Sequence, residues 1–257
     1  MPGYTPAPVP SPPPDPWANL RAYTAARIAL GRTGSSVPLR ESLAFRLAHA
    51  HARDAVYSVL DTERLAAELT ALGLPVCQVR SQAPDRQHYL QRPDWGRKLT
   101  KESAAYLREY APVATDVALI LADGLSATAT NRHVLPLLRL LVPQLQRAGF
   151  RLAPIALAEQ ARVALSDEIG AALHARLALI LIGERPGLSA PDSLGAYLTY
   201  HPRPGLTDEA RNCVSNIRPE GLPYPAAAEK LFYLVQESLR RQLSGVQLKD
   251  ETGLLGS

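Results

Sequence analysis

The sequence predicts an α/β fold, in which a Rossmann-like parallel sheet is flanked by helices and preceded by an N-terminal helical region. Unbroken aliphatic runs recur along the chain, and a strand with that pattern is buried on both faces, as in a parallel sheet that helices cover. Segments of helical period lie between these runs, so strands and helices alternate. Of the 257 residues, 46% are hydrophobic, which is enough to bury a sizeable core.

Three segments are predicted along the chain. Residues 1–16 hold eight of the 23 prolines and almost no large apolar side chains, which is typical of a disordered tail. Residues 17–110 are expected to form a helical region that carries a partner-contacting loop. Residues 111–250 are expected to form the Rossmann-like domain.

The N-terminal region begins with a helical pattern. Apolar side chains recur at roughly helical spacing from Trp17 to Ala52, with a break at residues 32–36. His49 and His51 would point about 200° from each other on a helix, so they cannot bind one metal ion there. The other elements predicted for this region are a helix over residues 65–72, a strand over 74–79 and a helix over 103–110.

Residues 85–99 are predicted to form a long polar surface loop. The segment holds three arginines together with Tyr89 and Trp95. A long loop with aromatic and arginine side chains is a candidate for contact with a partner. The alternative, that the two aromatic side chains only tether the loop to the domain, stays open.

The rest of the chain alternates strand and helix, the order that builds a parallel sheet. Residues 211–218 hold small polar groups and are assigned to no element. The pattern predicts strands over residues 117–122, 152–157, 177–182 and 193–200, and helices over 134–146, 167–173 and 226–239.

Polar residues follow the predicted strands. The strand over 177–182 ends in Gly-Glu-Arg-Pro-Gly at residues 183–187, where glycine lets backbone pass close to a neighbour and proline stiffens the turn. Ligands of open α/β sheets bind just beyond the carboxyl ends of the strands, so polar side chains there converge if the sheet is parallel. An ordinary polar loop remains the alternative. The residues at these ends are Asp123, Glu159, Arg162, Glu184 and Arg185.

The composition argues against several classes of protein. Lysine and arginine number 28 against 24 acidic residues, and the basic residues are scattered without aromatic platforms between them, which disfavours nucleic-acid binding. No apolar run approaches the ~20 residues of a membrane span, and the N-terminus lacks the pattern of a secretory signal. Cys77 and Cys213 suggest no disulfide framework, so a cytoplasmic location is expected.

Common catalytic motifs do not occur. The sequence contains no G-x-G-x-x-G, G-x-x-x-x-G-K-[ST] or G-x-S-x-G, and no cluster with metal-ligand spacing. Asp123, Ser126 and His133 do not fit a hydrolytic triad, because a helix after Ser126 would carry His133 away. The sequence thus predicts a binding scaffold with no catalytic residue or metal ligand of its own, and a cofactor would supply the chemistry.

Several short motifs occur together along residues 20–248. They are T-A-A-R-I-A-L-G-R from residue 24, Y-L-Q-R-P-D-W-G-R from 89, A-D-G-L-S from 122, R-V at 162, G-E-R-P-G-L from 183, D-S-L from 192 and R-N-C-V-S-N-I from 211. In this order they resemble the light (small) subunit of ethanolamine ammonia-lyase.

The resemblance implies an adenosylcobalamin-dependent enzyme that converts ethanolamine to acetaldehyde and ammonia by radical chemistry. A large TIM-type barrel subunit would hold the substrate, and the Rossmann-like domain of this chain would bind cobalamin at the interface between them. The cofactor contacts implied are Val163, Glu184 and Cys213. Glu184 is expected to accept hydrogen bonds from the amide arms or ribose, and Val163 and Cys213 to give backbone and packing contacts.

The resemblance also bears on cobalt ligation and packaging. Cys213 is not expected to ligate cobalt, because a small buried thiol is the simpler interpretation. No D-x-H-x-x-G motif occurs, and in this family the cofactor's own base stays on cobalt. Some members carry an amphipathic extension for packaging in a bacterial microcompartment, which the Pro-rich tail does not resemble.

Two other functions stay open at this point. One is a nucleotide-binding enzyme on a flavodoxin-like sheet, with Glu184 on a ribose, although the phosphate loop is missing. The other is a purely structural interaction subunit, whose arginines form an interface without any ligand.

Overall fold

The computed structural model describes residues 15–24, 26–71, 73–110 and 113–249. All but the last two residues of the predicted Pro-rich tail lie outside this part of the chain. None of the helices within it is both long and apolar enough to cross a membrane.

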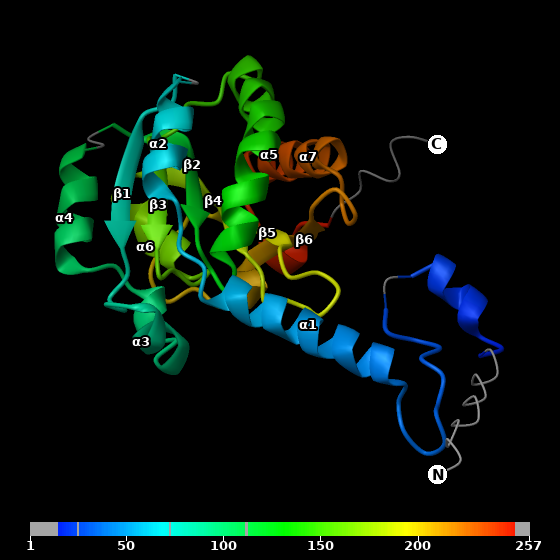
Figure 1. The fold of residues 1–257 in the computed structure, drawn as a ribbon. Coiled ribbons are helices and arrows are strands. Elements are labelled where there is room, and N and C mark those ends of the chain that lie inside the picture. Colours follow the sequence, from blue (N-terminus) through cyan, green and yellow to red (C-terminus); the bar gives the residue numbers. More distant parts are fainter. Residues whose placement is uncertain (1–14, 25, 72, 111–112, 250–257) are drawn as a thin grey trace, which may run out of the picture.

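A six-stranded sheet in the order β1-β3-β2-β4-β5-β6 forms the centre of the fold (Figure 1). The first four strands in this order are parallel, as predicted, but β5 runs antiparallel to β4 and β6 antiparallel to β5. The prediction of a Rossmann-like parallel sheet is therefore not confirmed, because the sheet is mixed. The strands are β1 (Val76–Arg80), β2 (Thr115–Ala122), β3 (Ile155–Glu159), β4 (Ala175–Gly183), β5 (Leu194–Tyr200) and β6 (Arg211–Ile217).

The length of two connections explains the change of direction. Residues 184–193 join β4 to β5, and residues 201–210 join β5 to β6. A parallel crossover needs about a dozen residues or more, usually a helix, so the chain turns back beside the strand it has just left. Strand β1 belongs to the same sheet although it precedes residue 111, where the predicted Rossmann-like domain begins. The division of the chain into three segments stays a prediction.

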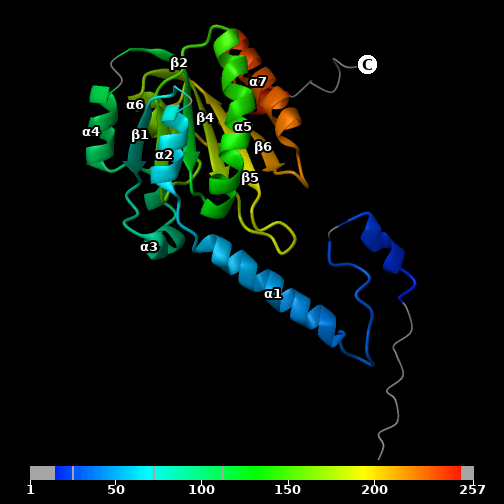
Figure 2. The same ribbon diagram turned by 45° about the horizontal axis from the view of Figure 1, so that its top comes forward.

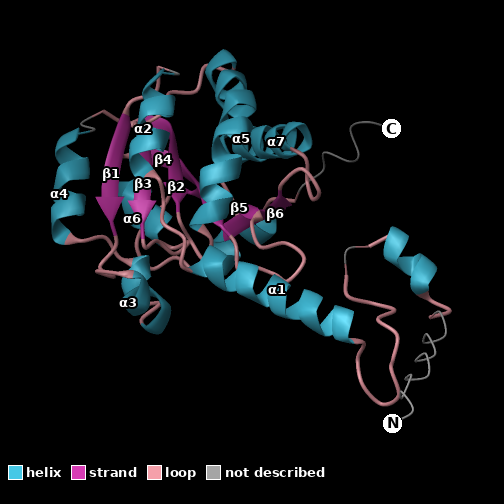
Figure 3. Cartoon of the chain, in the orientation of Figure 1, coloured by secondary structure: helices cyan, strands magenta, loops and turns pink. Residues whose placement is uncertain are grey.

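Helices cover both faces of the sheet (Figures 2 and 3). Along β2, Leu119 and Leu121 enter the apolar cluster of one face, and Ala118 and Ile120 enter that of the other. Burial on both faces explains why this strand is aliphatic throughout. Helices α2, α5 and α7 pack on the first face, and α4 and α6 on the second. Their bounds are α2 (Thr62–Ala71), α4 (Lys101–Tyr110), α5 (Ala127–Arg147), α6 (Leu165–Ala172) and α7 (Tyr224–Arg241).

Helix α1 (Leu39–Val56) projects away from the sheet domain in both ribbon views (Figures 1 and 2). Only Ala55 of this helix is buried. The predicted helical pattern over residues 17–52 is largely wrong before Leu39, since the 3-10 turn η1 (Ala18–Ala22) is the only helical element among the residues described there. Gly31 and Gly34 adopt the left-handed backbone, and Pro38 lies immediately before α1, so the helix cannot extend further back.

Three further segments differ from prediction. The loop expected over residues 85–99 contains helix α3 (Arg86–Gln91), which Asp85 caps by accepting from the His88 N–H at 2.9 Å, and the 3-10 turn η2 (Trp95–Arg97). Helix α5 begins earlier than residue 134, because Ser126 caps it. The unassigned residues 211–218 supply β6. The 3-10 turns η3 (Asp208–Ala210) and η4 (Gly245–Gln247) complete the described elements.

Candidate functional site

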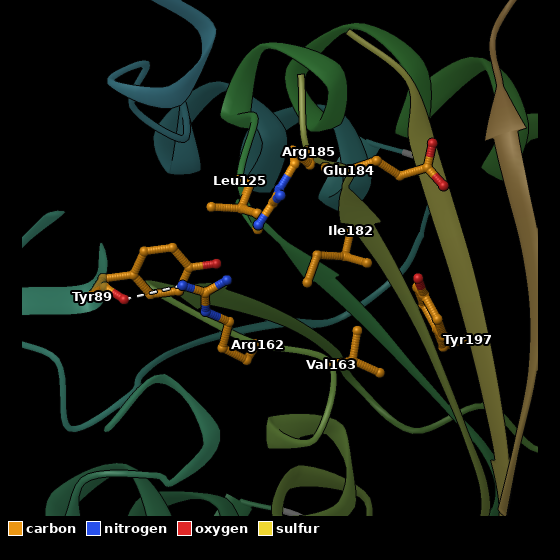
Figure 4. A pocket seen from close by; sticks show the side chains of 10 residues that line it. Tyr89, Leu125, Arg162, Val163, Ile182, Glu184, Arg185 and Tyr197 are labelled. Carbon is orange, nitrogen blue, oxygen red and sulfur yellow. Dashed lines mark hydrogen bonds between the residues drawn. The ribbon is translucent and has the colours of Figure 1, made fainter. Parts of the chain in front are cut away.

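Of two adjoining cavities, one of about 440 Å³ lies beyond the carboxyl ends of the parallel strands, and one of about 600 Å³ extends from it along β5 and β6. Both are lined by Arg162, Val163 and Tyr197, so together they form one cleft, called here the strand-end cleft. The first cavity also contains Glu184 and Arg185 (Figure 4), and the second contains Cys213. The three residues implied as cofactor contacts, Val163, Glu184 and Cys213, therefore line one continuous space.

Glu184 follows β4 and reaches across β5. Its Oε2 accepts the backbone N–H of Asn216 on β6 at 3.2 Å. Gly195 on β5 makes room for the side chain, since a Cβ there would lie 3.1 Å from both Cγ and Oε1 of Glu184. Within the described part of the chain Oε1 has no hydrogen-bond partner, so one carboxylate oxygen is fixed and the other is free to accept a hydrogen bond. Figure 4 shows Arg185 pointing the opposite way, toward Leu125 and Arg162.

Arg162 is held against a buried aromatic ring. Its guanidinium carbon lies 4.1 Å from the ring centroid of Tyr89, and its Nη2 donates to the Tyr89 carbonyl at 3.1 Å (Figure 4). Gly96 is required beside this pair, because a Cβ there would lie 2.9 Å from Cγ of Arg162. Nε of Arg162 is buried and has no partner among the described residues. The wall of the cleft thus holds a cation in a fixed place with one donor unused.

Tyr89, against which Arg162 packs, is itself held in place by burial and by a hydrogen bond. Its side chain is fully buried, and its hydroxyl donates to the Ala161 carbonyl at 3.1 Å. Burial raises the pKa of Tyr89 above its ordinary value, so the hydroxyl remains a donor. The guanidinium of Arg86 also lies 4.6 Å from the ring centroid. Tyr89, one of the two aromatic residues of the predicted surface loop, therefore has a structural role in the lining of the cleft.

Asp123 and Glu159 do not line either cavity. Asp123 accepts the N–H groups of Gln160 and Ala161 at 2.9 and 3.0 Å, which ties the end of β2 to the end of β3. Burial raises the pKa of Asp123 to about 6, so the carboxylate is still ionised at neutral pH. Glu159 pairs with Arg80 at 2.9 Å at the edge of the sheet. Among the five predicted strand-end residues, Arg162, Glu184 and Arg185 line the cleft.

Ser126 and His133 have separate structural partners. The Ser126 hydroxyl donates to the Pro191 carbonyl at 3.1 Å, and Nδ1 of His133 lies 2.8 Å from the hydroxyl of Tyr224. Helix α5 separates the two side chains along its length, as the sequence predicted. No hydrolytic triad forms from them and Asp123.

Cys213 and Tyr197 form the far wall. They are directly opposed on the antiparallel strands β6 and β5. Cys213 is exposed, which contradicts the expectation of a buried thiol, whereas Cys77 is buried. Partial burial raises the pKa of the Cys213 thiol, so it is protonated at neutral pH.

Sequence reasoning missed three residues that line the cleft: Tyr197, Arg97 and Arg211. A signal for Tyr197 was present. Leu194, Ala196 and Leu198 alternate along β5 and face the core, so Tyr197 must face the other side. The two arginines fall inside quoted motifs, but neither their charge nor their spacing marks them as cleft residues among the many arginines of the chain.

The sequence of the chain is similar to those of known proteins. Residues 14–249 match the family model described as ethanolamine ammonia-lyase light chain. The ethanolamine ammonia-lyase small subunit of Azotobacter vinelandii is 56% identical over 240 residues, which cover 92% of this chain and 89% of the relative. The small subunit of Ralstonia nicotianae is 56% identical over 239 residues, which cover 92% of this chain and 88% of the relative. The small subunit of Pseudomonas fluorescens SBW25 is 54% identical over 242 residues, which cover 93% of this chain and 87% of the relative.

Proposed function

We propose that this chain, which belongs to the ethanolamine ammonia-lyase light-chain family, binds adenosylcobalamin in the strand-end cleft. The family membership, which the motifs predicted, makes the chain a subunit of a carbon–nitrogen lyase. The name small subunit implies a larger partner subunit in a hetero-oligomer. We place that partner on the open side of the cleft, so that the two subunits bury the coenzyme between them.

The donors and acceptors of the cleft fit this coenzyme, and they are the observation that carries the proposal. A corrin ring has broad apolar faces and a rim of amide arms, which both donate and accept hydrogen bonds. The cleft offers apolar contact from Val163 and Ile182, an acceptor at Oε1 of Glu184 and an unused buried donor at Nε of Arg162. An unused buried donor costs free energy unless a ligand satisfies it.

The size of the cleft supports a shared site. Pockets of about 300–1,000 Å³ enclose most of a drug-sized ligand. Adenosylcobalamin is larger, so cavities of about 440 and 600 Å³ cover only one side of it. This chain alone is therefore expected to bind the coenzyme weakly.

Each named residue has a limited task in this proposal. Glu184 accepts a hydrogen bond and orients the coenzyme, while Val163 and Cys213 contribute packing and backbone contacts. When bound, the coenzyme supplies the radical chemistry. The chain itself excludes water from that chemistry and contributes no catalytic residue.

Helix α1 offers the partner a second surface. Leu39, Leu43 and Leu47 recur every four residues along one side of the helix and are 75%, 53% and 58% exposed. An apolar row on a projecting helix is typical of a protein–protein contact. We therefore include α1, together with the cleft, in the surface that meets the larger subunit.

Titration of the assembled complex tests the proposal. The chain is co-expressed with the larger subunit, and adenosylcobalamin is titrated while absorbance and ethanolamine turnover are recorded. Glu184→Gln keeps the shape of the side chain and removes its charge, so coenzyme affinity should fall about tenfold or more, as expected for a charge-assisted hydrogen bond. Glu63→Gln, on the exposed surface of α2, is the matched control and should change nothing.

Other outcomes would contradict the proposal. Unchanged coenzyme affinity in the Glu184→Gln complex, or turnover of ethanolamine by the isolated chain, would do so directly. Nucleotide binding by the isolated chain without any effect of cobalamin would favour the flavodoxin-like alternative. Assembly with no ligand dependence at all would favour a purely structural subunit.

A further inference from the structure

The second cavity of the strand-end cleft carries an excess of positive charge. Arg97, Arg162 and Arg211 line it, and the carboxylate among its lining residues is Asp208. We propose that this cavity is an anionic subsite that holds the phosphodiester of the coenzyme's nucleotide loop, with Arg97 as the residue that contacts it. This inference rests on the proposed function and adds to it the part of the ligand that the cavity recognises.

Arg97 is a cation that has no counterion among the described residues. It lies at the end of η2, and its side chain makes no hydrogen bond or ion pair within the described part of the chain. By contrast, the nearby Arg92 pairs with Asp94 at 2.7 Å. A solvated arginine at the mouth of a cavity is free to form a bidentate contact with a phosphate.

The other two arginines offer buried hydrogen-bond donors to the cavity. Nε of Arg162 is buried without a partner, and so is Nε of Arg211. The Arg211 side chain is only 2% exposed and is paired at its inner end with the buried Asp167. Asp208 also contacts Arg211, at 3.3 Å, but its side chain is 99% exposed, so solvent screens its charge. The donors in the cavity therefore outnumber the acceptors.

Backbone groups at the same place favour an anion as well. Val163 and Ala164 line the cavity in the turn that leads into α6. Their N–H groups have no acceptor among the described residues. The positive end of the α6 dipole adds to the charge of the arginines. Arginines, free N–H groups and a helix N-terminus together are suited to a phosphate group rather than to a neutral amide.

The test separates the phosphate from the rest of the coenzyme. Adenosylcobinamide lacks the nucleotide loop, whereas adenosylcobinamide phosphate keeps a phosphate but lacks the base. Both are titrated beside adenosylcobalamin into the complex of this chain with the larger subunit. Arg97→Gln should weaken adenosylcobalamin and adenosylcobinamide phosphate about tenfold and leave adenosylcobinamide within about twofold.

Lys98→Gln is the matched control, because it removes the same charge at the next position, outside the cavity. It should leave all three affinities within about twofold. Equal weakening of all three ligands by Arg97→Gln, or weakening of none, would overturn the subsite while the proposed function stood. Reduced affinity between the subunits, with no discrimination among ligands, would assign Arg97 to the protein interface and also overturn it. A wild-type complex that binds none of the ligands contradicts the proposed function itself, and the subsite with it.

Discussion

Gly183 is expected to be indispensable for stability, because backbone atoms occupy the space of a side chain. A Cβ at this position would lie 2.0 Å from the Ser126 carbonyl oxygen and 2.7 Å from that of Asp123, whereas real Cβ contacts do not fall below 3.0 Å. In Gly183→Ala the end of β4 must move by about 1 Å, and overpacking of this kind costs up to ~3 kcal/mol. The shift would also strain the bond from the Leu125 N–H to the Gly183 carbonyl, 2.9 Å long.

Urea unfolding followed by circular dichroism measures this cost. A loss of about 3 kcal/mol corresponds to a fall in Tm of roughly 6–12 °C for a chain of this size. Gly187→Ala is the control in the same motif, since the nearest atom to its Cβ, the Ala190 carbonyl oxygen, would be 3.6 Å away. That variant should be unchanged or more stable by about 0.4–1 kcal/mol, because alanine restricts the unfolded chain. Equal unfolding midpoints for the two variants would refute the reasoning.

Three further predictions concern buried polar groups. Tyr89→Phe loses one buried hydrogen bond to a carbonyl and should cost about 1 kcal/mol in urea unfolding; an unchanged midpoint would show that the bond contributes nothing. Arg211→Met leaves the buried Asp167 carboxylate without its cation and should cost about 3–5 kcal/mol, whereas adding Asp167→Leu should restore much of the stability. Burial holds the pKa of His133 below its ordinary value of 6.5, so the folded state favours the neutral ring. The stability advantage of wild type over His133→Gln should therefore be full above pH 6.5 and shrink as the pH falls. A pH-independent difference in stability would contradict this.

The parallel half of the sheet was predictable because its signal is local. The aliphatic runs at 117–122 and 177–182 fall inside β2 and β4, where both faces are buried. The carboxyl ends of parallel strands share one edge, which is why Arg162 and Glu184 meet in one cleft although 22 positions apart in sequence. The same rule could not say that Asp123 turns back to the backbone after β3, because that depends on the conformation of a turn rather than on residue type.

Strand β6 escaped prediction because only part of it is buried. Arg211, Val214 and Ile217 are buried and the residues between them are partly or fully exposed, so the strict alternation of a strand is lost. The register of pairing between β5 and β6 shifts between Leu194 and Ala196, which interrupts the alternation of buried and exposed side chains along β6. Polar composition therefore concealed an edge strand.

The antiparallel return of the chain has a consequence for the site. The predicted parallel topology did not specify which strand would receive the carboxylate of Glu184 at the end of β4. The turn back along β5 places β6 within reach, and the missing side chain of Gly195 lets Glu184 cross to the Asn216 N–H. The same return brings Cys213, in the second cavity, opposite Tyr197, which lines both cavities. The departure from the predicted topology is thus what gathers residues implied by the motifs into one cleft.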